Sequence, residues 1–88
     1  MLDLFSEFIG TFIFLTVIIV TGNPIAIGLT LTSMIYFSSK FSAGHFNPAV
    51  TYMMFFNKKI TMQKSLGYIV SQLLGASLAF FLYKKIKK

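Results

Sequence analysis

The chain has 88 residues, of which 56% are hydrophobic and only 11% are charged, and its net charge of +6 arises from lysine without any arginine. A soluble domain this small could not bury so much apolar surface, so the composition predicts an integral membrane protein. The absence of cysteine excludes disulfides and thiol chemistry. Lysines at the ends of apolar runs favour membrane anchoring over nucleic-acid binding.

The first apolar run covers residues 4–21. As a helix it would be about 27 Å long, which is close to the thickness of one bilayer core. Asp3 and Glu7 stand where a signal peptide would carry positive charge, so we expect a retained span and no cleaved leader. Gly22-Asn23-Pro24 then predicts a tight turn.

Three further elements follow this turn. Residues 25–39 predict a second span, with Lys40 reaching the interface from its end. Residues 48–57 predict a helix of about 15 Å, only half a bilayer, which ends at two lysines. Residues 65–83 predict a third span, preceded by Thr61 as a helix cap. The sequence therefore predicts a single-domain, all-α membrane protein with three transmembrane helices and one re-entrant half-helix.

The short helix opens with Asn47-Pro48 in the middle of an apolar chain. Asparagine caps the free N–H groups of a first turn, and proline fits that turn because its missing N–H is not needed there. In a soluble protein the same pair would indicate a surface turn. Here it predicts a half-helix that begins at membrane depth and directs its positive end, with the Asn47 side-chain N–H, towards a water-filled path.

Three motifs in chain order extend this interpretation. They are SEFIGTF at residues 6–12, SAGHFNPAVT at residues 42–51 and YIVSQLLGA at residues 68–76. Together they resemble one repeat of the aquaporin, or major intrinsic protein, family. Members of that family carry two such repeats related by inversion, with six spans and two half-helices. This chain resembles the first repeat: Val50 stands where the second repeat has its filter arginine, and Tyr52 departs from the usual aliphatic residue.

The resemblance implies a pore-lining or selectivity role for a set of eight residues. These are Asn47, Pro48 and Ala49 of the signature, Ala43, Gly44 and His45 with their backbone carbonyls, and Ile27 and Val50 at the narrow filter. With Ile27 in place of an aromatic residue and Val50 in place of arginine, the filter would be wide and apolar. Such a mouth favours ammonia, gases or small neutral solutes, or dewets.

Two polar residues inside the predicted spans have a different implied role. By resemblance, Glu7 and Gln72 brace the signature loop through hydrogen bonds. For Glu7, interfacial solvation and a proton relay are the alternatives. Small residues also recur at every fourth position of the last span, where they would let helices approach closely: Gly67, Ser71, Gly75 and Ala79.

The predicted function is a membrane channel subunit for passive transport of water or small neutral solutes. One repeat cannot enclose a pore, so its partner would be an inverted second copy or a separate second repeat, in contact with membrane lipid. Four lysines on each predicted side leave almost no bias towards one orientation. The alternative is a truncated or accessory protein that associates with full-length channels. With two carboxylates and one histidine, the sequence predicts no enzyme, no metal site and no cofactor.

Overall fold

The structure, a computed structural model, describes residues 1–87 as four α-helices and, within those residues, no strand. The helices are α1 (Leu2–Thr21), α2 (Pro24–Ser38), α3 (Pro48–Phe56) and α4 (Met62–Ile86). The predicted all-α class is therefore confirmed. Among the described helices, α1 and α4 are long and apolar enough to cross a membrane, and α2 is apolar but shorter.

Local signals set the boundary between α1 and α2. Gly22 ends α1 in the left-handed conformation, with φ of 58°, which a glycine adopts without steric cost. The Asn23 side chain then accepts hydrogen bonds from the N–H groups of Ile25 and Ala26, at 3.0 and 2.9 Å. Pro24 occupies the first turn of α2, where its missing N–H has no cost. The turn is therefore explained by its own three residues.

The starts of α3 and α4 are also capped by side chains. Asn47 Oδ1 accepts a hydrogen bond from the N–H of Ala49 at 2.8 Å, and Pro48 is the first residue of α3. Thr61 Oγ1 accepts from the N–H of Lys64 at 3.1 Å. Both caps are those that the sequence predicts, because a capping bond depends only on residues two or three positions apart.

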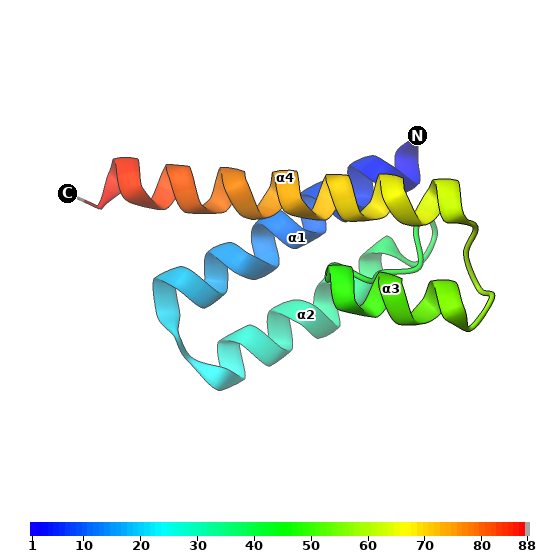
Figure 1. Ribbon diagram of the computed structural model, residues 1–88. Coiled ribbons are helices and arrows are strands. Elements are labelled where there is room, and N and C mark those ends of the chain that lie inside the picture. Colours follow the sequence, from blue (N-terminus) through cyan, green and yellow to red (C-terminus); the bar gives the residue numbers. More distant parts are fainter. Residues whose placement is uncertain (88) are drawn as a thin grey trace.

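The four helices form two packed pairs joined through α1 and α4. Figure 1 shows α4 lying along α1, with α2 and α3 below them. Helix α2 packs against α1 and α3 packs against α4, whereas α2 and α3 do not pack against each other. The loop after α2 turns back towards mid-length of the molecule, and α3 runs from there to the end at which α4 begins (Figure 1).

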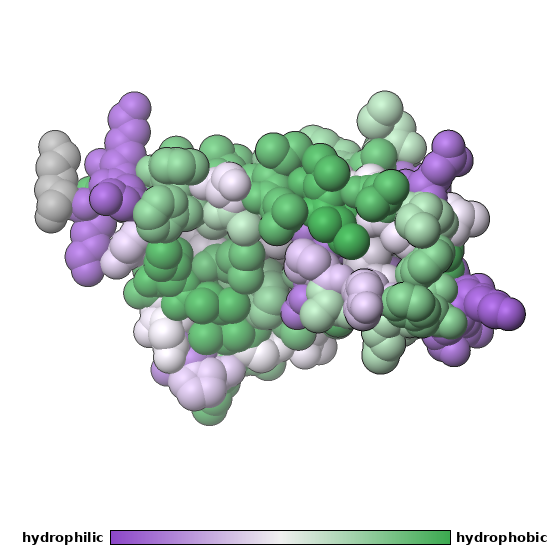
Figure 2. All heavy atoms as spheres, in the orientation of Figure 1, coloured by the Kyte–Doolittle hydropathy of each residue, from purple (hydrophilic) through white to green (hydrophobic). Residues whose placement is uncertain are grey.

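The burial pattern is the reverse of that in a soluble protein. The fully buried side chains include Glu7, Thr11, Thr51 and Gln72, whereas most large apolar side chains lie on the outside. Figure 2 shows a broad hydrophobic surface with hydrophilic residues gathered at its two ends. An exterior of this kind would be unfavourable in water and is suited to lipid.

Lysines are found at both hydrophilic ends of the molecule. The turn between α3 and α4 carries Lys58 and Lys59 at one end of the molecule, and α4 ends with Lys84 and Lys85 at the other (Figure 1). The last lysine of the predicted four-against-four distribution, Lys88, lies outside the described residues.

Candidate functional site: a buried carboxylate beneath the α2–α3 loop

Glu7 of α1 is completely buried and accepts four hydrogen bonds. Its Oε1 accepts from the backbone N–H of Phe46 and from Gln72 Nε2, both at 2.9 Å. Its Oε2 accepts from Ser42 Oγ at 2.9 Å and from the backbone N–H of His45 at 3.1 Å. Three of the four donors belong to the loop between α2 and α3, so a single side chain on α1 fixes both ends of residues 42–46.

Gln72 of α4 extends this network to α3. Its Nε2 donates both to Glu7 and to Thr51 Oγ1, each at 2.9 Å. Thr51 Oγ1 also lies 2.8 Å from His45 Nδ1. Gln72 therefore contacts side chains of α1 and α3, and the backbone of the loop is held by Glu7.

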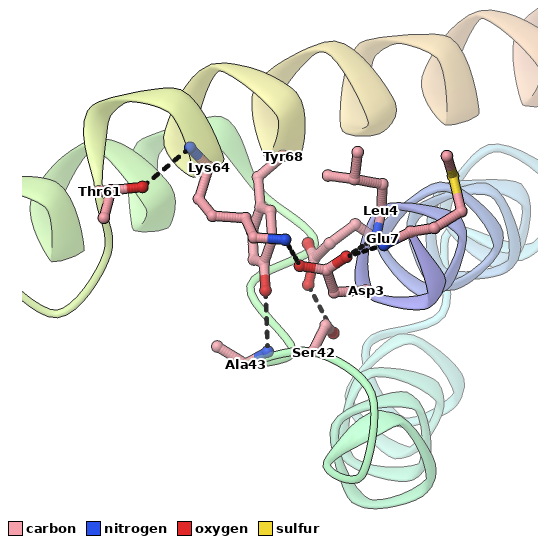
Figure 3. Close-up of polar contacts among 9 residues, drawn as sticks. Asp3, Leu4, Glu7, Ser42, Ala43, Thr61, Lys64 and Tyr68 are labelled. Carbon is pink, nitrogen blue, oxygen red and sulfur yellow. Dashed lines mark hydrogen bonds and ion pairs between the residues drawn. The ribbon is translucent and has the colours of Figure 1, made fainter.

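The outer part of the loop has its own hydrogen bonds. Ser42 Oγ accepts from the N–H of Gly44 at 3.1 Å, and Tyr68 Oη of α4 accepts from the N–H of Ala43 at 3.4 Å. Figure 3 shows Tyr68 reaching the loop from α4 while Glu7 reaches it from α1. Backbone N–H groups of irregular segments need such partners when water is excluded, because each unpaired group costs free energy.

Phe46 is held in an unusual conformation immediately before the short helix. Its φ is 52°, and its side chain is 2% exposed. Its ring occupies the space above Gly10 of α1, where an added Cβ atom would clash with Phe46 Cε1. Because a left-handed backbone is strained for a non-glycine residue, the ring pocket over Gly10 and the bond to Glu7 are needed to maintain it.

Asn47, by contrast, is exposed at the N-terminus of α3. Its Oδ1 is used by the cap, and within the described residues its amide nitrogen donates to no protein acceptor. Ala49 is also exposed, and Pro48 and Val50 are half-buried. The signature motif thus presents an amide donor and the first turn of a helix on the surface of this single chain.

The other predicted pore residues are divided by the fold. Ala43 is exposed, whereas Gly44 and His45 are buried in the loop beside Glu7. Ile27, half-buried on α2, and Val50, on α3, belong to helices that do not pack together. The structure therefore does not bring these two filter candidates together within one chain. Residues 1–87 also contain no group of three or more histidine, aspartate and glutamate side chains able to hold a metal ion.

The small residues of α4 differ in how closely they meet α1. Gly75 is buried, and a Cβ there would lie only 2.6 Å from the carbonyl oxygen of Phe8. Ala79 is buried as well. At Gly67 a Cβ would meet only the Leu4 side chain, at 3.0 Å, and Ser71 is half-buried. Of the two glycines in this set, Gly75 therefore meets the backbone of α1, whereas Gly67 meets only a side chain.

Several residues of this site were not predicted individually. Ser42, Thr51 and Tyr68 all take part in holding the loop, although in the sequence they stand out only as members of longer motifs. Thr11, one turn after Glu7, is 1% exposed, and its Oγ1 is buried without a partner among the described residues, as is Gln72 Oε1. A polar residue that recurs one helical turn from a buried glutamate is the signal that could have identified Thr11.

Comparison with known proteins identifies the family. The sequence model of the Major intrinsic protein family matches residues 1–88 of this chain. The chain is 43% identical over 83 residues to Glycerol uptake facilitator protein-like 6 of Lactiplantibacillus plantarum. The matched region covers 84% of this chain and 38% of that protein. It is 35% identical over 88 residues to Probable aquaporin PIP1-5 of Arabidopsis thaliana, covering 81% and 31%, respectively. It is 34% identical to Aquaporin PIP1.1 of Vicia faba, with the same shares.

No solved structure matches significantly. The chain spans about a third of the length of these curated relatives. Aquaporins and glycerol uptake facilitators are multi-pass membrane channels and not enzymes. The match over the whole chain, together with the apolar helices and the lipid-suited exterior, shows that this protein is an integral membrane protein of the major intrinsic protein family.

Proposed function

We propose that the chain is a subunit of a membrane channel for passive movement of water or small neutral solutes. In this proposal α1, α2 and α4 cross the bilayer, and α3 is a half-helix that enters and leaves on one side. A helix of nine residues is about 14 Å long, roughly half of a bilayer core of about 30 Å. Its start at mid-length of the molecule would place Asn47 near the membrane centre (Figure 1).

The observation that carries the proposal is the exposed helix start held in place by a buried carboxylate. Glu7 binds the N–H groups of His45 and Phe46, the two residues immediately before Asn47. This arrangement fixes the Asn47 amide and the positive end of α3 at one depth. A fixed N–H donor at mid-membrane would orient a passing water molecule, while the positive helix end would oppose cations.

A second half-helix is required to complete the path. The free face around Asn47 would meet the same face of an inverted copy, as two-fold symmetry requires, or a separate second repeat. The balanced lysines at the two ends of the molecule favour insertion in both orientations. In such a pair Ile27 and Val50 would contribute apolar groups to the mouth, which supports small neutral solutes as cargo.

The test is osmotic shrinkage of liposomes that contain the chain, with an internal control that the sequence provides. The chain has two Asn-Pro helix starts, Asn47-Pro48 and Asn23-Pro24, and aspartate is as good a cap as asparagine. Asn47→Asp replaces the proposed pore donor by an acceptor with a negative charge, whereas Asn23→Asp makes the same change at the α1–α2 turn. We expect fast shrinkage that Asn47→Asp alters and Asn23→Asp leaves unchanged.

Two results would contradict the proposal. The first is flux that responds equally to both substitutions, because the path would then not pass Asn47. The second is the absence of flux from folded protein, both alone and after co-reconstitution with a second repeat, which would favour the accessory role. Labelling of single introduced cysteines at each end would separately test the inverted copy, since every copy in one orientation would exclude it.

A further inference from the structure

The end of the molecule at which α3 turns into α4 contains an open depression of about 950 Å³. One wall is apolar and comes from Met54, Phe55 and Ile60, and the rim carries Lys58, Lys59 and Lys64. In Figure 2 hydrophilic residues at this end adjoin the hydrophobic surface. The depression therefore combines cations with an apolar wall and lies beside the hydrophobic exterior.

The charges in this depression are not balanced. Asp3 is the one acidic residue among its lining residues, and its carboxylate pairs with both Lys64 Nζ and the N-terminal amine (Figure 3). Lys58 and Lys59 form no ion pair within residues 1–87. Two exposed ammonium groups thus remain available to a negatively charged ligand.

The backbone of the turn keeps these two lysines in place. The N–H of Lys58 donates to the Phe55 carbonyl oxygen and the N–H of Lys59 to that of Met54, both at 3.0 Å. This pair of bonds closes the helix with Lys58 in the left-handed conformation, at φ of 60°. Glycine is the usual residue there, so a lysine at this position has a conformational cost and suggests a use for its side chain.

We propose that this depression binds the headgroup of an anionic phospholipid. The Lys58 and Lys59 ammonium groups would bind the phosphate, and the acyl chains would follow the apolar wall of α3. Charge complementarity and the position beside the hydrophobic exterior favour a lipid over a soluble anion. Because Ala43 and His45 also line the depression, the bound headgroup would adjoin the loop that positions Asn47. Lipid binding itself does not depend on the proposed transport.

The test is native mass spectrometry of the detergent-solubilised full chain with phosphatidylglycerol and, separately, with phosphatidylcholine of the same acyl chains. The chain offers a matched control, because Lys84 and Lys85 form a second adjacent pair at the opposite end. We expect Lys58→Gln/Lys59→Gln to weaken phosphatidylglycerol binding by a factor on the order of ten. Lys84→Gln/Lys85→Gln should leave it within about twofold, and phosphatidylcholine should bind weakly to all variants.

Three outcomes would overturn the inference. Equal losses in both double variants would show only an effect of net charge. Equal binding of the two lipids would show that the headgroup charge is not recognised. Displacement of the lipid by inorganic phosphate at matched concentration would assign the lysines to a soluble anion. Circular dichroism of each variant establishes that folding is retained, so that a loss can be assigned to the lysines.

Discussion

Replacement of Glu7 by glutamine should destabilise the protein far more than its small change in shape suggests. The carboxylate accepts four hydrogen bonds, two at each oxygen. In Glu7→Gln one oxygen keeps its two donors, and the new NH₂ group faces the other two. With about 1.5–3 kcal/mol for each hydrogen bond to a charged group, the loss is about 3–6 kcal/mol in the free energy of unfolding.

The measurement is reversible unfolding in mixed micelles by titration with sodium dodecyl sulfate, followed by far-UV circular dichroism. Asp3→Asn is the control, since it removes the other carboxylate of the chain at an exposed ion pair, where the expected loss is small. A contradictory result would be a loss of less than about 1 kcal/mol in Glu7→Gln, or a loss no larger than that of Asp3→Asn. The hydrogen bonds to the loop would then not determine stability.

Three substitutions and one control, Gly28→Ala, test the packing and the backbone. Gly75→Ala should cost about 1–3 kcal/mol of unfolding free energy, because its Cβ would lie 2.6 Å from a carbonyl oxygen of α1. Gly28 has open space around it, so Gly28→Ala should gain about 0.5–1 kcal/mol. Equal effects of the two substitutions in the same titration would contradict the close approach at Gly75. Gly10→Ala should expel the Phe46 ring and expose the loop, seen as faster backbone hydrogen exchange of residues 42–47, and unchanged exchange would show that the ring is not needed. Lys58→Gly should raise stability by about 1 kcal/mol in uncharged detergent by relieving the left-handed residue, and a loss there would mean that its conformation is not strained.

The buried face of α4 shows how far the pattern of small residues was informative. Residues at strict intervals of four rotate by about 40° per step around a helix of 3.6 residues per turn, so they drift off one face. The face that the structure buries has intervals of three and four instead: Ser65, Tyr68, Gln72, Gly75 and Ala79. The predicted pattern of small residues therefore included the buried Gly75 and Ala79. It omitted the buried Tyr68, and it included Ser71, which is only half-buried.

The loop shows a different limit. Its partners on α1 and α4 lie 25 to 39 residues away along the chain from the loop groups that they bind. No local pattern encodes which donors meet Glu7, since this depends on the depth and rotation at which α1 and α4 pack. The hydrogen bonds of Ser42 and Thr51, and the contact of Phe46 with Gly10, depend on how these helices pack and are not encoded by neighbouring residues.

The helical elements, the lipid surroundings and the family of this protein all follow from its amino-acid sequence without knowledge of the fold. Helix starts at Asn23-Pro24, Asn47-Pro48 and Thr61 depend on bonds between near neighbours, and an apolar composition with terminal lysines requires lipid whatever the fold. Which polar groups are buried together depends instead on how the helices pack, because a buried carboxylate is tolerated solely where the packed helices bring enough donors to it.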